Sequence, residues 1–261
     1  MHRSLSYIDP QAKIARNVVL EPFVCIEKNV EIGSGTWIGS NVTIMEGARI
    51  GKNCEIFPGA VISAIPQDLK FRGEESLAII GDNTIIRECA TINRATSITG
   101  KTIVGDNCLI MAYAHIAHDC IIGDNSIIVN NVALGGHVII GEYAIIGGLS
   151  AIHQFVNIGK HTMVSGGSLV RKDVPHFVKA GREPLSFVGI NSIGLRRRGF
   201  SEKKIEEIQN IYRFLYQKNF NNTQAINQIE IEFKASEIRD EIISFVKKSG
   251  RGIMRGYNQN K

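Results

Sequence analysis

The chain has 261 residues, of which 44% are hydrophobic, and carries a net charge of +5 with a pI near 8.9. This length allows one large domain, or a large domain with a small companion, and the mild positive charge predicts no nucleic-acid binding while suiting an acidic or phosphate-bearing partner. Five cysteines without a CxxC pair and an N-terminus without an apolar run favour a cytoplasmic protein with reduced thiols and no transmembrane segment.

An aliphatic residue recurs at every sixth position between Ile8 and Val170. Of the 28 positions in this series, 26 hold Ile, Leu or Val. The six-residue period matches neither the 3.6 residues of a helix turn nor the alternation of a plain strand. The residue two places before each aliphatic position is small or β-branched, so the two would share the inner face of a short strand. Glycine often follows the aliphatic residue, which we interpret as a tight corner. The pattern predicts a β-solenoid.

Two segments interrupt the repeat. Residues 64–78 place Asp68 at an aliphatic position, and a charge facing a dry core would be costly, so we expect an external loop. Residues 94–101 are a weaker candidate for a loop, because Ile98 keeps the aliphatic position. Residues 173–177, after the last repeat, are expected to lead the chain out of the solenoid.

Helical patterns replace the repeat after about residue 195. Ser201 is a good N-cap and apolar residues follow it at helical spacing. Further helices are expected from near Thr223 and from Ser236. The predicted organisation is a β-solenoid domain of residues 1–190 and a small C-terminal α-helical domain of residues 191–261.

The six-residue pattern resembles that of the hexapeptide-repeat acyltransferases, which form left-handed parallel β-helices. In that family three hexapeptides make one triangular coil, so residues 18 apart lie in one column. The resemblance implies a left-handed parallel β-helix here, with Ile116, Leu134 and Ile152 stacked. Four of the seven histidines would lie beside this column, outward or at a corner: His115, His118, His137 and His153.

His118 followed by Asp119 is typical of a general base whose carboxylate partner fixes the tautomer. Cys120 is expected to face inward, and no serine or cysteine nucleophile is evident, which favours direct attack by a substrate hydroxyl or amine. The clustered histidines could instead be ordinary surface residues, a structural ladder or a zinc site. Because no fourth ligand is evident, acid–base chemistry is the preferred interpretation, and we predict no metal and no cofactor.

Five segments together resemble the UDP-N-acetylglucosamine O-acyltransferases, which catalyse the first step of lipid A biosynthesis. The resemblance covers nearly the whole chain. It implies transfer of a 3-hydroxyacyl chain from acyl carrier protein to the 3-position of UDP-N-acetylglucosamine by a homotrimer with active sites between subunits. The segments are Gln67–Lys70, Ala114–Asp119, Gly136–His137, Ile152–Phe155 and Gly194–Phe200.

The resemblance also implies a role for individual residues. His118 would be the general base, Asp119 its partner, and the Gly136 amide would hold the thioester oxyanion. The residues expected to position substrates are Gln67, Asp68, Lys70, His115, His137, His153 and Gln154.

The nucleotide would be held by Asn191, Arg197 and Arg198, since arginine suits a diphosphate in charge and geometry. Without the other motifs, this arginine run would be interpreted as a solvated basic segment. Gly166 would leave the end of the acyl groove open to a long chain. Some family members have an acidic residue two positions after the asparagine, where this chain has Ile193, and this departure concerns the ribose or uracil contact.

Two alternative functions remain at this point. The related N-acyltransferase of the same pathway has an extra N-terminal domain, whereas the repeats here begin at Ile8. A non-catalytic solenoid scaffold would need no clustered histidines and would not bind UDP-N-acetylglucosamine, and a zinc hydrolyase would lose activity with a chelator. The acyl length and the acceptor group, a 3-hydroxyl or a 3-amine, are left open.

Overall fold

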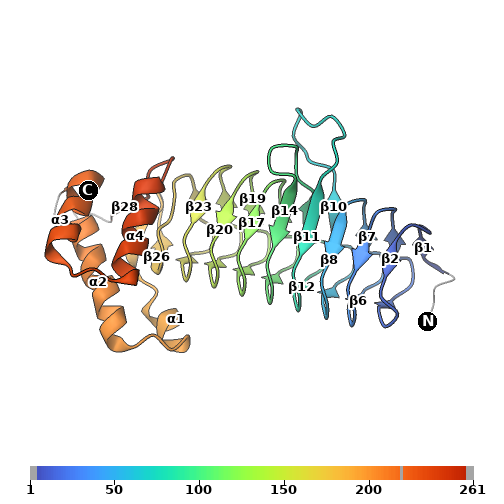
Figure 1. Cartoon of the computed structure of the whole chain (residues 1–261), viewed down its shortest axis with the longest axis horizontal. Coiled ribbons are helices and arrows are strands. Elements are labelled where there is room, and N and C mark those ends of the chain that lie inside the picture. Colours follow the sequence, from blue (N-terminus) through green and yellow to red (C-terminus); the bar gives the residue numbers. More distant parts are fainter. Residues whose placement is uncertain (1–4, 218–219, 257–261) are drawn as a thin grey trace.

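The computed structural model, described for residues 5–217 and 220–256, is a long three-sided solenoid with helices packed at one end (Figure 1). Each coil contributes one short strand to each of three sheets, which we call A, B and C. The nine strands of sheet A are β1 (Tyr7–Ile8), β4 (Cys25–Ile26), β7 (Thr43–Ile44), β10 (Val61–Ala64), β13 (Thr91–Asn93), β16 (His115–Ile116), β19 (Ala133–Leu134), β22 (Ala151–Ile152) and β25 (Leu169–Val170).

Sheets B and C complete the prism. Sheet B contains β2 (Lys13–Ile14), β5 (Glu31–Ile32), β8 (Ala48–Ile50), β11 (Leu77–Ile80), β14 (Lys101–Val104), β17 (Ile121–Ile122), β20 (Ile139–Ile140) and β23 (Asn157–Ile158). Sheet C contains β3 (Val19–Leu20), β6 (Trp37–Ile38), β9 (Glu55–Ile56), β12 (Ile85–Ile86), β15 (Leu109–Ile110), β18 (Ile127–Ile128), β21 (Ile145–Ile146), β24 (Met163–Val164), β26 (Val178–Gly181), β27 (Ser186–Ile190) and β28 (Arg255–Gly256).

The fold is the predicted left-handed parallel β-helix. Ile116 pairs with Leu134, which pairs with Ile152, so the expected column is confirmed. The aliphatic residues from Leu20 onward are buried in almost every coil, and Cys120 faces inward as predicted. Because inner positions are either aliphatic or small, successive coils stack through a dry core.

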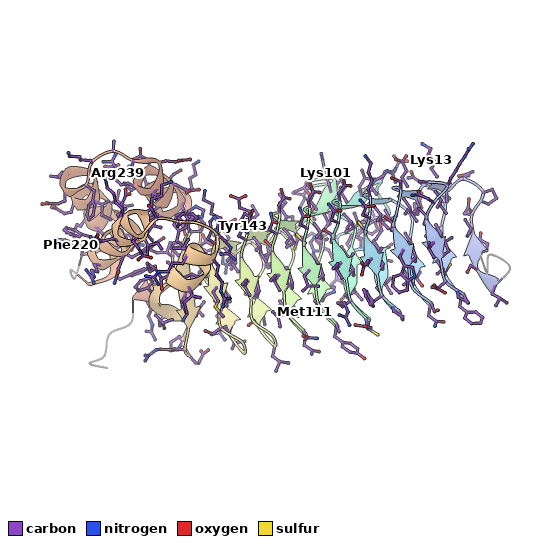
Figure 2. All side chains as sticks on the ribbon, turned by 90° about the horizontal axis from the view of Figure 1, so that it is seen from below. Lys13, Lys101, Met111, Tyr143, Phe220 and Arg239 are labelled. Atoms are coloured by element: carbon purple, nitrogen blue, oxygen red, sulfur yellow. The ribbon has the colours of Figure 1, made fainter. Side chains whose placement is uncertain are left out.

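The three edges of the prism are named here by the sheets that they join. The A–B corner includes residues 117–120, 135–138 and 153–156. The B–C corner includes 123–126, 141–144 and 159–162, and the C–A corner includes 111–114, 147–150 and 165–168. Figure 2 shows Lys13 and Lys101 of sheet B projecting on one side and Met111 of the C–A corner on the opposite side.

The left-handed backbone at each corner does not fall on the glycine that follows the aliphatic residue. The third residue after the aliphatic position is left-handed, and asparagine often fills it, as at Asn41 (φ 60°) and Asn125 (φ 59°). The glycines directly after the aliphatic position are not left-handed. A Cβ on Gly105, for example, would lie 2.2 Å from the Asp124 carboxylate of the next coil. These glycines do lie at the corners, as interpreted, but what requires them is the close approach of two coils and not a left-handed backbone.

Both interruptions of the repeat lie at the A–B corner. Residues 65–76 join β10 to β11, and residues 94–100 join β13 to β14, and they project together from one edge (Figure 1). Ile98 does not keep a core position, because its side chain is 71% exposed, so the spacing misled us there. Residues from both loops reach the coils that carry the histidines.

The solenoid continues beyond Val170, so the predicted exit at residues 173–177 was wrong. Val174 bridges to Ile158, and β26 pairs in parallel with β24. In the part of the chain that the structure describes, four helices follow β27: α1 (Ser192–Arg197), α2 (Glu202–Gln217), α3 (Asn222–Glu232) and α4 (Glu237–Lys248).

Helix α1 was not expected from the sequence. Ser236 caps α4 as predicted, its hydroxyl accepting from the Arg239 amide at 3.0 Å. Helix α3 has a capping box of Asn221 and Gln224, slightly before the expected start. Within the described part of the chain, no helix is long and apolar enough to cross a bilayer.

Candidate active site

His118 and Asp119 form a close pair at the A–B corner. His118 Nδ1 lies 2.7 Å from Asp119 Oδ2, and the Asp119 side chain is fully buried. An ionised carboxylate accepts only, so the contact requires the proton on Nδ1 and leaves Nε2 with its lone pair. This arrangement can accept a proton from a hydroxyl or an amine.

Asp119 is held by residues that sequence reasoning missed. Thr96 donates to Oδ2 through its hydroxyl at 2.8 Å, and the Thr99 hydroxyl donates to Oδ1. Burial alone would raise the pKa of the Asp119 carboxyl, but hydrogen bonds from Thr99, His118 and Thr96 outweigh it and hold the pKa below its usual value. The signal in the sequence was a threonine-rich interruption, which gains meaning only once the loop is known to reach this corner.

Gly136 lies one coil after His118 and directly against its ring. A Cβ on Gly136 would come within 2.5 Å of His118 Cε1 and 2.7 Å of Nε2. Among the described residues, the Gly136 amide has no backbone acceptor, and the same holds for most of the equivalent amides of the other coils. What distinguishes Gly136 is the imidazole beside it, which places a free N–H donor next to a candidate base.

Three more predicted residues gather around this pair. His137 Nε2 lies 3.8 Å from Asp119 Oδ2. Burial lowers the pKa of His137, while the Asp119 and Asp68 carboxylates act in the opposite direction, so the loop residue Asp68 lies close enough to affect it. His115 Nδ1 contacts the Thr91 hydroxyl at 2.8 Å, and burial followed by the nearby His118 lowers its pKa.

The remaining residues predicted for this corner are exposed. His153 and Gln154 lie on the following coil, where His153 Nδ1 is 3.0 Å from the Gln154 carbonyl oxygen. Gln67 and Lys70 lie on the loop of residues 65–76, and the Lys70 amide donates to Asp68 at 2.9 Å. These side chains are free to meet a ligand from solvent.

The predicted nucleotide residues lie elsewhere, at the B–C corner. Arg198 stands over the Tyr143 ring at 5.2 Å, and Tyr143 stacks on His161 at 5.0 Å. Within the described chain, Arg198 Nη1 and His161 Nδ1 are buried without a hydrogen-bond partner. Arg197 is exposed on α1. A partly buried arginine with an unpaired N–H suits an anionic group.

Asn191 has a structural task at the same corner. It is only 4% exposed, its amide donates to the His161 carbonyl at 2.9 Å, and its oxygen caps α1 through the Gly194 amide at 3.3 Å. Asn191 therefore fixes the helix that carries the arginines. Ile193 is exposed beside it.

Gly166 lies at the C–A corner, across sheet A from the histidines. Its backbone is not left-handed, since Gly167 takes that role with φ 69°. A Cβ on Gly166 would lie 3.1 Å from the Gly148 carbonyl oxygen and would otherwise face solvent.

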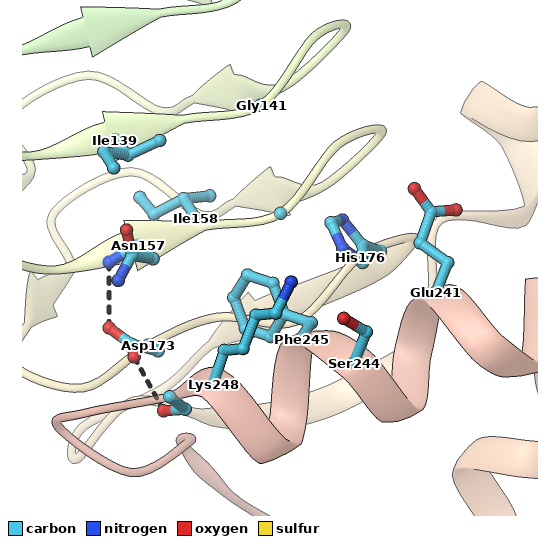
Figure 3. Close-up of a pocket in the computed structure, with 12 residues that line it drawn as sticks. Ile139, Gly141, Asn157, Ile158, Asp173, His176, Glu241, Ser244, Phe245 and Lys248 are labelled. Carbon is cyan, nitrogen blue, oxygen red and sulfur yellow. Dashed lines mark hydrogen bonds between the residues drawn. The ribbon is translucent and has the colours of Figure 1, made fainter.

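Two other features resemble binding sites. His118, Asp119 and His137 have ligand atoms within 4.8 Å of one another, but both oxygens of Asp119 already accept hydrogen bonds, which fits an acid–base pair better than a metal centre. A cavity of about 390 Å³ lies between sheet B and α4, lined partly by His176, Phe245 and Lys248 (Figure 3). None of the predicted site residues lines it.

Comparison with known proteins decides the family. Residues 173–254 match the model described as UDP N-acetylglucosamine O-acyltransferase, domain 2, residues 101–136 match the hexapeptide transferase repeats, and residues 3–103 match a GMPPB C-terminal domain. The acyl-[acyl-carrier-protein]–UDP-N-acetylglucosamine O-acyltransferase of Thermodesulfovibrio yellowstonii is 42% identical over 249 residues, which cover 95% of this chain and 96% of that protein. The enzyme of the same name from Chlorobium phaeobacteroides is 54% identical over 201 residues, 76% of each chain. This chain belongs to the UDP-N-acetylglucosamine O-acyltransferase family.

Solved structures of the acyltransferase family agree with this assignment. The UDP-N-acetylglucosamine acyltransferase of Bacteroides fragilis superposes with a TM-score of 0.94 at 50% identity, covering 96% of this chain and 98% of that one. The Arabidopsis enzyme gives a TM-score of 0.84 at 30% identity, covering 96% and 99%. In this acyltransferase the predicted residues other than Gly166 fall into two groups on opposite edges of sheet B, one with the histidines and one with the arginines.

Proposed function

We propose that this protein transfers a 3-hydroxyacyl chain from acyl carrier protein to the 3-position of UDP-N-acetylglucosamine, the first step of lipid A biosynthesis, in the cytoplasm. Family membership supports the reaction. The observation that carries the mechanism is the 2.7 Å contact between His118 Nδ1 and the buried Asp119 carboxylate, which leaves Nε2 as the proton acceptor.

In the proposed reaction, His118 Nε2 removes the proton of the 3-hydroxyl as its oxygen attacks the thioester carbonyl. A C–O bond forms, and the negative charge on the carbonyl oxygen is met by the Gly136 N–H. The C–S bond then breaks, and the proton on His118 passes to the departing thiol of the carrier protein. Asp119 stabilises the transient imidazolium without taking the proton itself.

We further propose a homotrimer with sites between subunits. The histidine group and the arginine group lie on opposite edges of sheet B, which favours a site assembled from two chains. The outer face of sheet B is charged at Lys13, Glu31 and Arg49, then aliphatic over four coils: Ile79, Ile103, Ile121 and Ile139.

Ile121 and Ile139 are 39% and 43% exposed in the single chain, which leaves apolar surface uncovered. A closed three-fold ring with sheet B facing the axis would bury this surface. It would also bring the A–B corner of one copy to the B–C corner of the next. The histidines and arginines would then face one substrate across the interface.

The test is an acyl-transfer assay read by mass spectrometry. It uses UDP-N-acetylglucosamine and its 3-amino analogue as acceptors, with carrier proteins loaded with 3-hydroxyacyl chains of graded length. His118→Ala should lower kcat by on the order of 100-fold or more, since general-base catalysis contributes about that much. His176→Asn, which changes a partly buried histidine outside the A–B corner, serves as the control. Near-normal turnover in a folded His118→Ala protein would remove His118 from the mechanism.

A further inference from the structure

The loop of residues 94–100 holds Asp119 from several directions. Thr96 donates to Oδ2 through its hydroxyl at 2.8 Å and its amide at 3.1 Å. Thr99 donates to Oδ1 through its hydroxyl and through its amide at 3.3 Å, while its hydroxyl lies 3.1 Å from the Lys101 carbonyl. Both carboxylate oxygens are thus fixed by one loop.

The fixation matters because two imidazoles compete for the same oxygen. Oδ2 of Asp119 lies 2.7 Å from His118 Nδ1 and 3.8 Å from His137 Nε2. A small rotation of the carboxylate would shift it from one ring to the other. Phe155 stacks on His137 with ring centroids 4.6 Å apart, so the second ring stays in place. The orientation of the carboxylate therefore decides which of the two histidines Oδ2 contacts.

We infer that Thr96 and Thr99 are positioning residues that fix the Asp119 carboxylate on His118 and exclude His137. This inference deepens the proposed function, because it rests on His118 being the base. Neither threonine needs to touch substrate. By holding the carboxylate they keep the proton on His118 Nδ1, and Nε2 stays available to the acceptor hydroxyl.

The charged and titratable groups around the pair are His137 on the next coil, His115 on β16 and Asp68 on the loop of residues 65–76. A carboxylate that loses its threonine donors is free to turn from His118 toward His137, and it then stabilises the His118 imidazolium less. The imidazolium then loses its proton at lower pH. The inference therefore predicts a changed pH profile as well as a lower rate.

The experiment compares Thr99→Val and Thr96→Val with Thr99→Ser, which keeps the hydroxyl. Thr84→Val is the matched control, because the Thr84 hydroxyl is buried at the B–C corner and donates to the Gly105 carbonyl at 2.8 Å, not to a carboxylate. Initial rates are measured across pH with saturating 3-hydroxyacyl carrier protein. We expect kcat of Thr99→Val to fall about tenfold, the lower end of what a hydrogen bond to a charged group is worth, with KM for UDP-N-acetylglucosamine unchanged.

The acidic limb of the pH profile should move to lower pH in both valine variants and return in Thr99→Ser. Spectra of ¹⁵N-histidine-labelled protein, with the His118 signals assigned from His118→Ala, should show a single Nδ1–H tautomer in the parent and a mixture in the valine variants. Parent-like profiles and tautomers in both valine variants would overturn the inference, as would losses equal to those of Thr84→Val. A parent protein that fails to acylate UDP-N-acetylglucosamine would overturn the proposed function instead, and the spectra would still test the positioning role.

Discussion

Gly136 offers the sharpest test of the active-site geometry, through the single methyl group of Gly136→Ala. A Cβ there would lie 2.5 Å from His118 Cε1, whereas ordinary contact begins at 3.4 Å, so the ring must move by the difference of 0.9 Å. A displacement of about 1 Å in a catalytic group can cost on the order of 100-fold in rate. The same methyl group would crowd the N–H that is proposed to hold the oxyanion. We therefore expect kcat to fall by about 100-fold.

The assay is steady-state acyl transfer at saturating donor, with thermal unfolding measured in parallel. Gly148→Ala is the stability control, because Gly148 occupies the equivalent position at the C–A corner and a Cβ there would lie 3.1 Å from the Asn130 carbonyl oxygen. The two variants should unfold at similar temperatures. A Gly136→Ala enzyme with parent-like kcat would show that neither the ring position nor the amide matters as we have argued.

Three further predictions follow from the interface, the acyl groove and the buried histidines. Ile121→Glu should convert a trimer of three 28.7 kDa chains into inactive monomers in ultracentrifugation, and an active monomer would contradict the shared site. Gly166→Met should shift preference to donors several carbons shorter, about fourfold in affinity for each excluded methylene, whereas equal loss for all donors would remove Gly166 as a determinant of chain length. Burial lowers the pKa of His161 and His176 to about 4, while unfolded histidine titrates near 6.5. The unfolded chain therefore binds more protons between these values, and the free energy of unfolding should fall by about 3 kcal/mol per histidine as pH drops through that window. In urea unfolding, His176→Asn should remove about half of this fall in unfolding free energy. An unchanged fall would show that His176 does not cause it.

The repeat was predictable because a single geometric requirement acts in every coil. An inward aliphatic residue at each sixth position suffices to predict stacked coils, and the column of Ile116, Leu134 and Ile152 follows from it. Spacing fails where a segment leaves the coil. Ile98 stands at a sixth position of the series and is aliphatic, yet it lies in a loop exposed to solvent. Composition located the corners but did not separate their two requirements, because asparagine takes the left-handed position and glycine allows the close approach of coils.

The site was only partly predictable, because its residues depend on contacts between distant segments. His118 and Asp119 are adjacent in sequence, so their pairing could be anticipated. The donors to Asp119 are Thr96 and Thr99, more than a coil earlier, and no local pattern connects them with it. Asn191 was assigned a ligand from its motif, whereas the structure also gives it a helix cap and a bond to the His161 carbonyl.

The one-dimensional stacking of the coils has a consequence for how the molecule opens. Each coil touches mainly its neighbours, so unfolding should begin at a free end and advance coil by coil. Ile8 and Ile14 of the first coil are only partly buried, while Leu20 and the following aliphatic residues are enclosed, and the other end is covered by helices. Amide exchange should therefore be fastest near the N-terminus and slow down toward His118. Several N-terminal coils would therefore have to open before the coil that carries His118.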